Sequence, residues 1–154
     1  MAILLDDGNE PRRPDLKQFE LVRWLDLAPF EDFVGLGIES IADGEACLSV
    51  SFRLCLANGG GVMHGGALTT LADTAVAMAI KSLLPEGTIF ATTELHTSFL
   101  APVTVGTVTA RAKARGPEGR TFYGEAELFA ADGTLVARFR SVFRVARGQG
   151  FDDL

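Results

Sequence analysis

The stretch from Asn58 to Leu84 constrains this chain more than any other, because a glycine-dense loop leads directly into a long run that lacks glycine and proline. Glycine adopts positive φ at little cost and lets the backbone lie close to a ligand. The run after Gly66 is rich in helix formers, which predicts a helix from about Gly65 to Leu83. Apolar residues occur on all sides of that helix, so we expect it to be buried rather than amphipathic.

The predicted helix carries a single carboxylate, Asp73, and no basic residue lies within one turn of it. Burying an unpaired carboxylate is costly, so its presence suggests a catalytic role. The alternative is structural: Asp73 faces solvent or a subunit interface, or it is held by Thr69 or Thr70. This residue alone does not decide between the two hypotheses.

Length and composition restrict the class of protein. A chain of 154 residues is expected to form one domain. Its net charge of −6 disfavours nucleic-acid binding, which usually requires a net basic footprint. The sequence has neither the apolar run of roughly 18 residues that a membrane span needs nor the pattern of a signal peptide. We therefore expect a cytoplasmic protein that binds neither nucleic acid nor membrane.

The N-terminal part is predicted to be accessory to the domain. Residues 1–14 are polar and contain two prolines, which predicts a disordered or loosely attached arm. From Asp15 a helix is expected, ending at Pro29 and followed by a short helical turn over Phe30–Phe33. The apolar positions of the longer helix would be Leu16, Phe19, Leu21, Val22 and Leu25. The domain itself is predicted over residues 15–147, with a frayed tail over 148–154.

Alternation of apolar and polar residues predicts about six strands. Two precede the helix, from Val34 to the Asp43-Gly44 turn and from Ala46 to Cys55. Cys47 and Cys55 would then lie about 26 Å apart on one strand, too far for a disulfide, and are expected to be reduced apolar fillers. Four strands follow, over 88–100, over 104–115, around 122–128 and around 135–143. This order predicts an α+β domain in which a curved antiparallel sheet wraps one long helix.

Several motifs share a pattern with a known family. The central one is Asn58-x5-His64-Gly65-Gly66-x6-Asp73. Others are Phe99-Leu100-Ala101-Pro102, Gly119-Arg120-Thr121-x-Tyr123 and Asp132-Gly133-x-Leu135-Val136-Ala137. Over roughly residues 30–146 the chain resembles the hotdog-fold acyl-CoA thioesterases of the phenylacetate-degradation (PaaI-like) type. The resemblance implies an enzyme that hydrolyses an acyl-CoA to a free acid and CoA, with no metal or other cofactor.

The resemblance also implies roles for the motif residues. The backbone N–H of Gly65, at the positive end of the helix, would polarise the thioester carbonyl. His64 and Asn58 would orient the loop or hydrogen-bond the thioester and the water. Asp73 would act either as a general base on water or as a nucleophile that forms an anhydride. A hydroxyl at the start of the following strand often helps to hold the water, and Thr92 matches that position.

Thr93 is the alternative for that hydroxyl. Gly66 and Met63 are assigned to substrate binding, and Arg115 and Arg120, on either side of the Gly116–Gly119 turn, to the CoA phosphates. The acyl pocket would accept a medium aliphatic chain or an aryl ring; its candidate lining is Met63, Leu68, Met78, Phe90 and Phe99. By contrast, Glu127 opposite Arg138 and Glu125 opposite Arg140 are expected to be structural cross-strand pairs on the solvent face.

The oligomeric state is predicted from how much of the sheet the single long helix can cover. One helix cannot cover a six-stranded sheet, and the strand over 88–100 would leave a long edge that favours pairing with a second copy. The resemblance implies such a homodimer, doubled to a homotetramer, in which Asp73 faces Asn58, His64 and Gly65 of the other chain. Two rival functions stay open, a hotdog hydratase or dehydratase on acyl thioesters and a non-catalytic acyl-CoA-binding protein. The His-Gly-Gly and Asp arrangement matches the hydrolase pattern.

Overall fold

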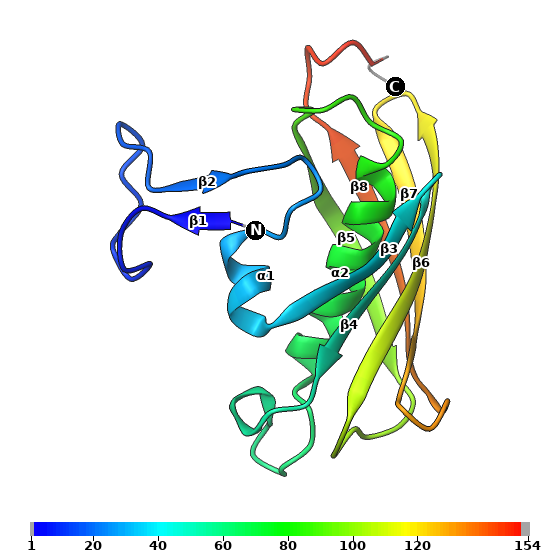
Figure 1. The fold of residues 1–154 in the computed structure, drawn as a ribbon. Coiled ribbons are helices and arrows are strands. Elements are labelled where there is room, and N and C mark those ends of the chain that lie inside the picture. Colours follow the sequence, from blue (N-terminus) through cyan, green and yellow to red (C-terminus); the bar gives the residue numbers. More distant parts are fainter. Residues whose placement is uncertain (1, 152–154) are drawn as a thin grey trace.

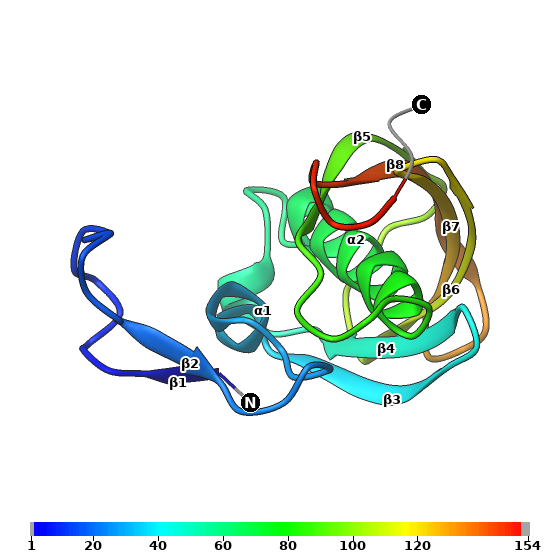
Figure 2. The same ribbon diagram turned by 90° about the horizontal axis from the view of Figure 1, so that it is seen from above.

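The computed structural model of the protein describes residues 2–151. One long helix, α2 (Gly65–Lys81), lies against the concave face of a six-stranded antiparallel sheet (Figure 1). Figure 2 shows the sheet curving around that helix. The strand order is β3-β4-β6-β7-β8-β5. The strands are β3 (Leu36–Ala42), β4 (Glu45–Ser51), β5 (Phe90–Phe99), β6 (Thr107–Glu118), β7 (Thr121–Phe129) and β8 (Leu135–Val145). The predicted hotdog architecture is confirmed.

The sheet accepts α2 at close range because its inner face is lined with small residues. Ala110, Ala112 and Ala126 are buried beneath the helix. Gly124 is required at the closest approach, since a Cβ atom there would overlap the side chain of Val76. The helix buries ten of its residues, so the prediction of a buried helix is confirmed for the side that faces the sheet. It ends at Lys81, two residues earlier than predicted.

The opposite side of α2 forms a partly exposed stripe of small and polar residues. Its members recur at helical spacing and are Gly66, Thr70, Asp73, Ala77 and Lys81. The prediction of apolar residues on all sides therefore holds only in part. The physical reason is that the sheet wraps one side of the helix and leaves this stripe open, with Asp73 at its middle.

The N-terminal segment differs from the prediction. The helix expected from Asp15 is absent; β1 (Ala2–Leu4) and β2 (Phe19–Leu21) instead form an antiparallel ribbon that projects from the body (Figures 1 and 2). The apolar residues of β2 alternate with Glu20, a period of two that suits a strand rather than a helix. Of the segment predicted to be a disordered or loosely attached arm, residues 2–4 pair with β2, and the ribbon stands apart from the sheet.

Other boundaries are corrected as well. Pro29 does not end a helix but begins α1 (Pro29–Val34), a position where its missing N–H costs nothing. The strand predicted to reach Cys55 stops at Ser51, and Cys55 lies in a 3-10 turn, η1 (Leu54–Leu56), so the two cysteines share no strand. Both are free thiols.

The predicted frayed tail packs on the body as far as it is described. The Gln149 side chain accepts a hydrogen bond from the Ile89 N–H at 3.1 Å, and the Phe151 ring lies edge-on to Phe122. Positions 152–154 of that prediction lie outside the described residues. Along residues 2–151, no helix is both long and apolar enough to cross a membrane.

Candidate functional site

Asp73 is tied to strand β5 by a side-chain hydrogen bond. The Thr92 hydroxyl donates to Asp73 Oδ1 at 2.8 Å. One turn earlier on α2, the hydroxyls of Thr69 and Thr97 lie 3.0 Å apart. Residues four apart share one face of a helix, so this face of α2 runs along β5. The structural hypothesis that Thr69 or Thr70 holds Asp73 is therefore wrong; Thr92 does so.

A β-bulge decides which threonine reaches Asp73. The pairing of β5 with β8 shifts between Thr92 and Glu94, leaving Thr93 as the extra residue. Strict alternation from Thr97 would have turned Thr93 toward the helix. The bulge resets the alternation, so Thr92 faces Asp73 while the Thr93 hydroxyl donates to the Val142 carbonyl at 3.2 Å.

The environment of Asp73 favours its neutral form. Burial raises the pKa of this carboxyl above its ordinary value, and the hydrogen bond from Thr92 partly offsets the rise. A half-buried carboxylate with a raised pKa is a stronger base once it is ionised, and such groups occur often at catalytic sites. The arrangement can therefore accept a proton from a water molecule or attack an electrophilic carbon.

A second carboxylate near this site, Glu31 on α1, was not among the predicted site residues. Its side chain accepts a hydrogen bond from the Ala28 N–H at 2.6 Å, across the start of α1. Burial raises the pKa of Glu31, the bond to Ala28 and the Lys81 charge lower it, and the Asp73 charge raises it again. The spacing of Glu31 after Ala28 is that of a capping residue, which is the sequence signal that could have placed it.

The N-terminus of α2 presents a free backbone donor. His64 is the N-cap, and its Nδ1 accepts a hydrogen bond from the Gly66 N–H at 2.8 Å. Within the described chain, the Gly65 N–H donates to no protein acceptor. Gly65 also lies against β5, since a Cβ atom there would come 2.9 Å from the Phe99 ring. The Gly65 N–H, which was predicted to polarise the thioester carbonyl, is therefore available. The Gly66 N–H is not, because it donates to His64.

Asn58 organises the glycine loop. Its side-chain oxygen accepts hydrogen bonds from the Gly60 N–H at 2.8 Å and the Val62 N–H at 3.3 Å. Asn58 and His64 are both exposed, so each has a structural role within its own chain and a surface open to solvent. Met63, which follows the loop, is 3% exposed and belongs to the core.

Distance separates the two halves of the predicted site. Gly65 and Asp73 are eight positions apart on one continuous helix. At ~1.5 Å per residue, this spacing places them about 12 Å apart. A single thioester carbonyl cannot contact the Gly65 N–H and the Asp73 carboxylate of the same chain.

The two arginines assigned to CoA phosphates differ in accessibility. Arg115 is exposed, lies over the Tyr123 ring at 4.5 Å and approaches Glu118 at 3.8 Å. Arg120 is 8% exposed and donates to the Val145 carbonyl at 2.9 Å. The assignment of Arg120 is corrected, because its guanidinium stabilises the backbone inside the fold. A register shift in the β6–β7 pairing follows Arg115 and separates the environments of the two residues.

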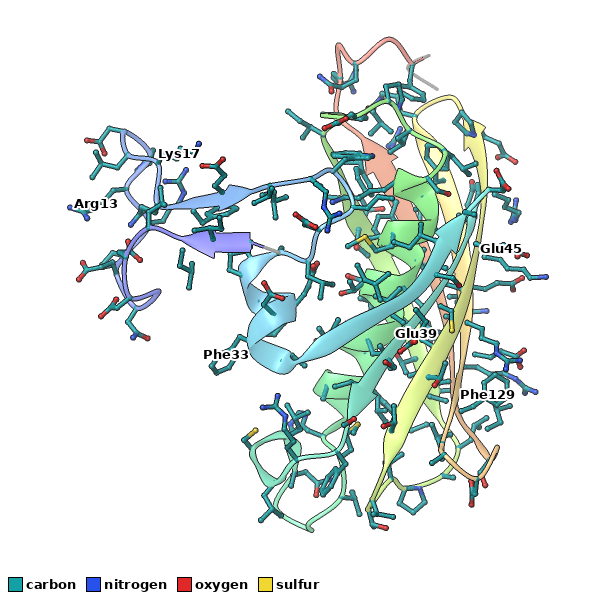
Figure 3. The ribbon with its side chains drawn as sticks, in the orientation of Figure 1. Arg13, Lys17, Phe33, Glu39, Glu45 and Phe129 are labelled. Atoms are coloured by element: carbon teal, nitrogen blue, oxygen red, sulfur yellow. The ribbon has the colours of Figure 1, made fainter. Side chains whose placement is uncertain are left out.

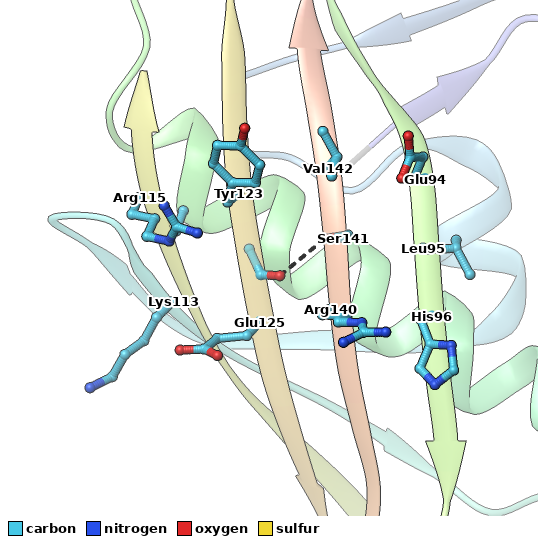
Figure 4. A pocket seen from close by; sticks show the side chains of 12 residues that line it. Glu94, Leu95, His96, Lys113, Arg115, Tyr123, Glu125, Arg140, Ser141 and Val142 are labelled. Atoms are coloured by element: carbon cyan, nitrogen blue, oxygen red, sulfur yellow. Dashed lines mark hydrogen bonds between the residues drawn. The ribbon is translucent and has the colours of Figure 1, made fainter. Parts of the chain in front are cut away.

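Two cavities open on the outer face of the sheet, away from Asp73. One, of about 590 Å³, is lined by residues such as Lys113, Tyr123 and Arg140, with α2 behind the sheet (Figure 4). Its neighbour, of about 790 Å³, extends toward Arg138. Neither cavity is lined by Asp73, so neither is the candidate catalytic site.

This outer face carries the cross-strand charge pairs expected from the sequence. Glu127 pairs with Arg138 in register, at 3.7 Å between charged atoms, and Glu125 lies opposite Arg140 in the same strand register. His96, on the same face, lies 3.2 Å from the Ser98 hydroxyl. Among the described residues, no three His, Cys, Asp or Glu side chains group as metal ligands.

Comparison with known proteins agrees with this arrangement. The model of the family described as "Thioesterase superfamily" matches residues 60–137, a range that includes His64, Gly65, Asp73 and Thr92. A conserved protein of Pseudomonas aeruginosa with a solved structure is 30% identical, with a TM-score of 0.76 over 82% of this chain and 100% of that one.

Two further relatives match this chain over different lengths. The PaaI protein from the phenylacetic acid degradation operon of E. coli is 29% identical, with a TM-score of 0.72 over 79% of this chain and 87% of that one. A Halobacterium salinarum protein whose name describes it as an esterase is 39% identical over 75 residues, 46% of this chain. That match spans 50% of the relative's own length.

Proposed function

Because the chain belongs to the thioesterase superfamily, we propose that it hydrolyses an acyl-CoA thioester to the free acid and CoA, with Asp73 as the central catalytic residue. The observation that carries the proposal is the 2.8 Å hydrogen bond from Thr92 to a half-buried Asp73 whose pKa is raised by burial. A thioester is already activated, so a positioned base and a polarised carbonyl suffice, and no metal or redox cofactor is proposed.

In the proposed reaction the Asp73 carboxylate takes a proton from water, and the hydroxide attacks the thioester carbon. The Gly65 N–H, at the positive end of α2, stabilises the oxygen that becomes negative. The carbon–sulfur bond then breaks, CoA leaves as a thiolate, and the proton held by Asp73 returns to the sulfur. In the alternative route, the Asp73 carboxylate attacks the carbon directly, and the carbon–sulfur bond breaks to expel CoA as a thiolate and leave an anhydride. Water then hydrolyses the anhydride to the free acid and the Asp73 carboxylate, and the proton released from that water neutralises the CoA thiolate.

The site is proposed to be shared between two subunits. One chain holds Gly65 and Asp73 about 12 Å apart, so the partner subunit's Gly65 would serve Asp73. Strand β5 is an edge of the sheet, and Leu95 and Phe99 on it are 48% and 54% exposed. Pairing of two β5 edges would cover these side chains and bring each Asp73 toward the partner's His64 and Asn58.

Substrate contacts follow from the same assembly. Exposed Arg115, on its cation–π contact with Tyr123, is the proposed contact for the CoA phosphates. Gly66, next to the donor at Gly65, would lie against the acyl group. Met63, which the sequence also assigned to substrate binding, is buried in the core and is not proposed as a contact. Phe99 beside Gly65 offers an exposed apolar wall that suits an aryl or an aliphatic chain.

Acyl-CoA turnover tests the proposal directly. The full chain is incubated with a panel of aliphatic and aryl acyl-CoAs, and a thiol reagent reports free CoA. We expect CoA release from at least one member and its loss in Asp73→Asn. Conversion of an enoyl-CoA without release of thiol would favour the hydratase, and tight binding of acyl-CoA without any turnover would favour the binding protein.

A further inference from the structure

Helix α1 packs against α2 with one face and presents the other to solvent. Phe30 and Phe33 are 62% and 83% exposed, and Phe33 points away from the sheet (Figure 3). Glu31 and Val34 have the same spacing of three residues; Val34 is buried and Glu31 is half-buried. Since residues three apart share one face of a helix, Glu31 belongs to the face of α1 that packs on the body.

The carboxylate of Glu31 keeps its charge in this position. Its Oε2 atom accepts the hydrogen bond from the Ala28 N–H at 2.6 Å, which a neutral oxygen could equally accept. Along residues 2–151, Glu31 forms no ion pair with a basic side chain. The hydrogen bond to the backbone therefore fixes the side chain, while the negative charge is left without a direct partner.

Glu31 lies within electrostatic reach of Asp73. Burial raises the pKa of Glu31, and the charge of Asp73 adds to that rise. Strand β5, on the other side of Asp73, contributes hydroxyl groups to this face of α2, from Thr92 and Thr97. Partly buried charges are screened less by salt than exposed ones. The packing of α1 thus sets a second negative charge beside the candidate base.

The basic residue of α2, Lys81, is held by another group. Its Nζ donates to the Trp24 carbonyl at 3.0 Å and lies 4.6 Å from the centre of the Trp24 ring. The Trp24 indole N–H donates in return to the Lys81 carbonyl at 3.2 Å. Lys81 follows Asp73 by eight positions, which is about 12 Å along the helix. Lys81 offsets part of the charge of Glu31, but it does not pair with either carboxylate.

We propose that Glu31 makes the site select against acyl groups that carry a negative charge, so that its substrates have uncharged acyl chains or rings. This inference rests on the proposed function. The thioester carbon contacts Asp73 during attack, which brings the acyl group close to Glu31. A carboxylate on that group would be repelled across several ångströms without touching Glu31, because charges interact more strongly in a half-buried site than in water. A neutral group of the same shape meets no such repulsion.

Matched substrates isolate the effect of charge. Adipoyl-CoA ends in a carboxylate, and its terminal amide has nearly the same shape without the charge. The corresponding aryl pair is 4-carboxybenzoyl-CoA and 4-carbamoylbenzoyl-CoA. A thiol reagent reports CoA release and gives kcat/KM for each compound at about pH 8, well above the ordinary pKa of a carboxylic acid. The measured quantity is the ratio of kcat/KM for the carboxylate to kcat/KM for the amide.

Glu31→Gln removes the charge and keeps an oxygen that can accept from the Ala28 N–H. We expect the wild-type ratio to be well below one and to rise about tenfold in this variant, the order of one like-charge repulsion in a partly screened site. Each ratio compares two substrates on the same protein, so a change in folding or in the strength of the base affects both rates and cancels. The ratio therefore reports the charge of Glu31 rather than its structural role.

Two further variants complete the test. Asp32→Asn makes the same chemical change one position along α1, at an exposed residue, and should keep the wild-type ratio. Glu31→Asp keeps the charge and should stay closer to the wild-type ratio than Glu31→Gln does. A wild-type ratio of one or more overturns the inference without any variant, and so does an unchanged ratio in Glu31→Gln. Those results leave the proposed hydrolysis intact, whereas no CoA release from any acyl-CoA refutes both.

Discussion

Thr92 donates a hydrogen bond to Asp73, and a one-residue bulge in β5 is what brings these two side chains together. The bulge places the hydroxyl on the inner face of an edge strand, 2.8 Å from a carboxylate on the open stripe of α2. A residue that holds the carboxylate also sets which of its oxygens is left for water. The pair therefore links the local irregularity of the strand to the proposed chemistry.

Replacing Asp73 with Asn should remove the base or nucleophile while keeping the shape. We expect kcat for the best acyl-CoA to fall at least about 10²-fold, the usual contribution of a general base. Glu127→Gln is the control, since that carboxylate pairs with Arg138 on the outer face and should leave kcat within a few fold. If Asp73→Asn kept more than half of the wild-type kcat, the assignment of Asp73 would be wrong.

Replacing Thr92 with Val should separate the two adjacent threonines. The hydrogen bond from Thr92 lowers the pKa of Asp73, so its loss should raise that pKa further and move the acid limb of the pH–rate profile to higher pH. We also expect about a tenfold lower kcat/KM, the typical worth of a hydrogen bond to a charged group. Thr93→Val is the control: the Thr93 hydroxyl donates to the Val142 carbonyl of β8 rather than to Asp73, so this variant should leave the pH–rate profile unmoved. Equal shifts in both variants would contradict the role of the bulge.

Asp73 should also make stability depend on pH. Its pKa is raised in the folded state, so the folded protein binds this proton more tightly than the unfolded chain, and stability falls as pH rises through the interval above 3.8. Asp73→Asn should therefore melt at a higher temperature than wild type at neutral pH, with the difference shrinking in acid. Asp132→Asn is the opposite control, because hydrogen bonds from Thr134 lower the pKa of Asp132 and its stabilisation is lost as pH falls. A lower melting temperature for Asp73→Asn at neutral pH would refute the burial argument.

The donor at Gly65 can be removed with little change elsewhere. Proline suits the first position of a helix and lacks an N–H, so Gly65→Pro should delete the proposed contact to the carbonyl. Gly65→Ala is the matched control, because it adds the same Cβ beside the Phe99 ring but keeps the N–H. We expect kcat to fall about 10²-fold more for proline than for alanine. Steady-state kinetics with equal values for the two variants would exclude this donor from the mechanism.

Much of the fold could be predicted because it follows from periodicity. Alternation predicted the strands of the sheet, and the glycine-free run predicted α2. The ribbon was missed because five apolar residues from Leu16 to Leu25 have a spacing close to that of a helix, and pairing with β1 is a long-range contact that local spacing does not show. The open stripe of α2 was missed for a related reason, since the sequence does not show which side the sheet covers.

Candidate site residues that belong to a sequence motif could be named from the sequence. Residues whose orientation depends on a register shift between strands could not be placed in this way. Thr92 could be named only with Thr93 as its alternative, because the bulge in β5 decides which of the two side chains faces the helix. Arg120 was grouped with Arg115 by its position near one turn, but a shift in the β6–β7 pairing puts it inside the fold. Thr92 was nevertheless the residue predicted first, and it is the one that bonds to Asp73, whereas the assignment of Arg120 was wrong. Residue types alone do not show where a strand carries an extra residue.

The shared site can be tested by mixing two inactive variants. Asp73→Asn chains and Gly65→Pro chains are dissociated, mixed in equal amounts and allowed to reassociate. In a mixed dimer one site carries both lesions and the other pairs an intact Asp73 with the partner subunit's intact Gly65. With random pairing, half of the dimers are mixed and each has one working site, so about one quarter of wild-type activity should return. Each variant dissociated and reassociated alone is the control and should stay inactive. If mass spectrometry verifies mixed dimers and no activity returns, Asp73 and Gly65 act within one chain or not together, because a site confined to one chain always carries one of the two lesions.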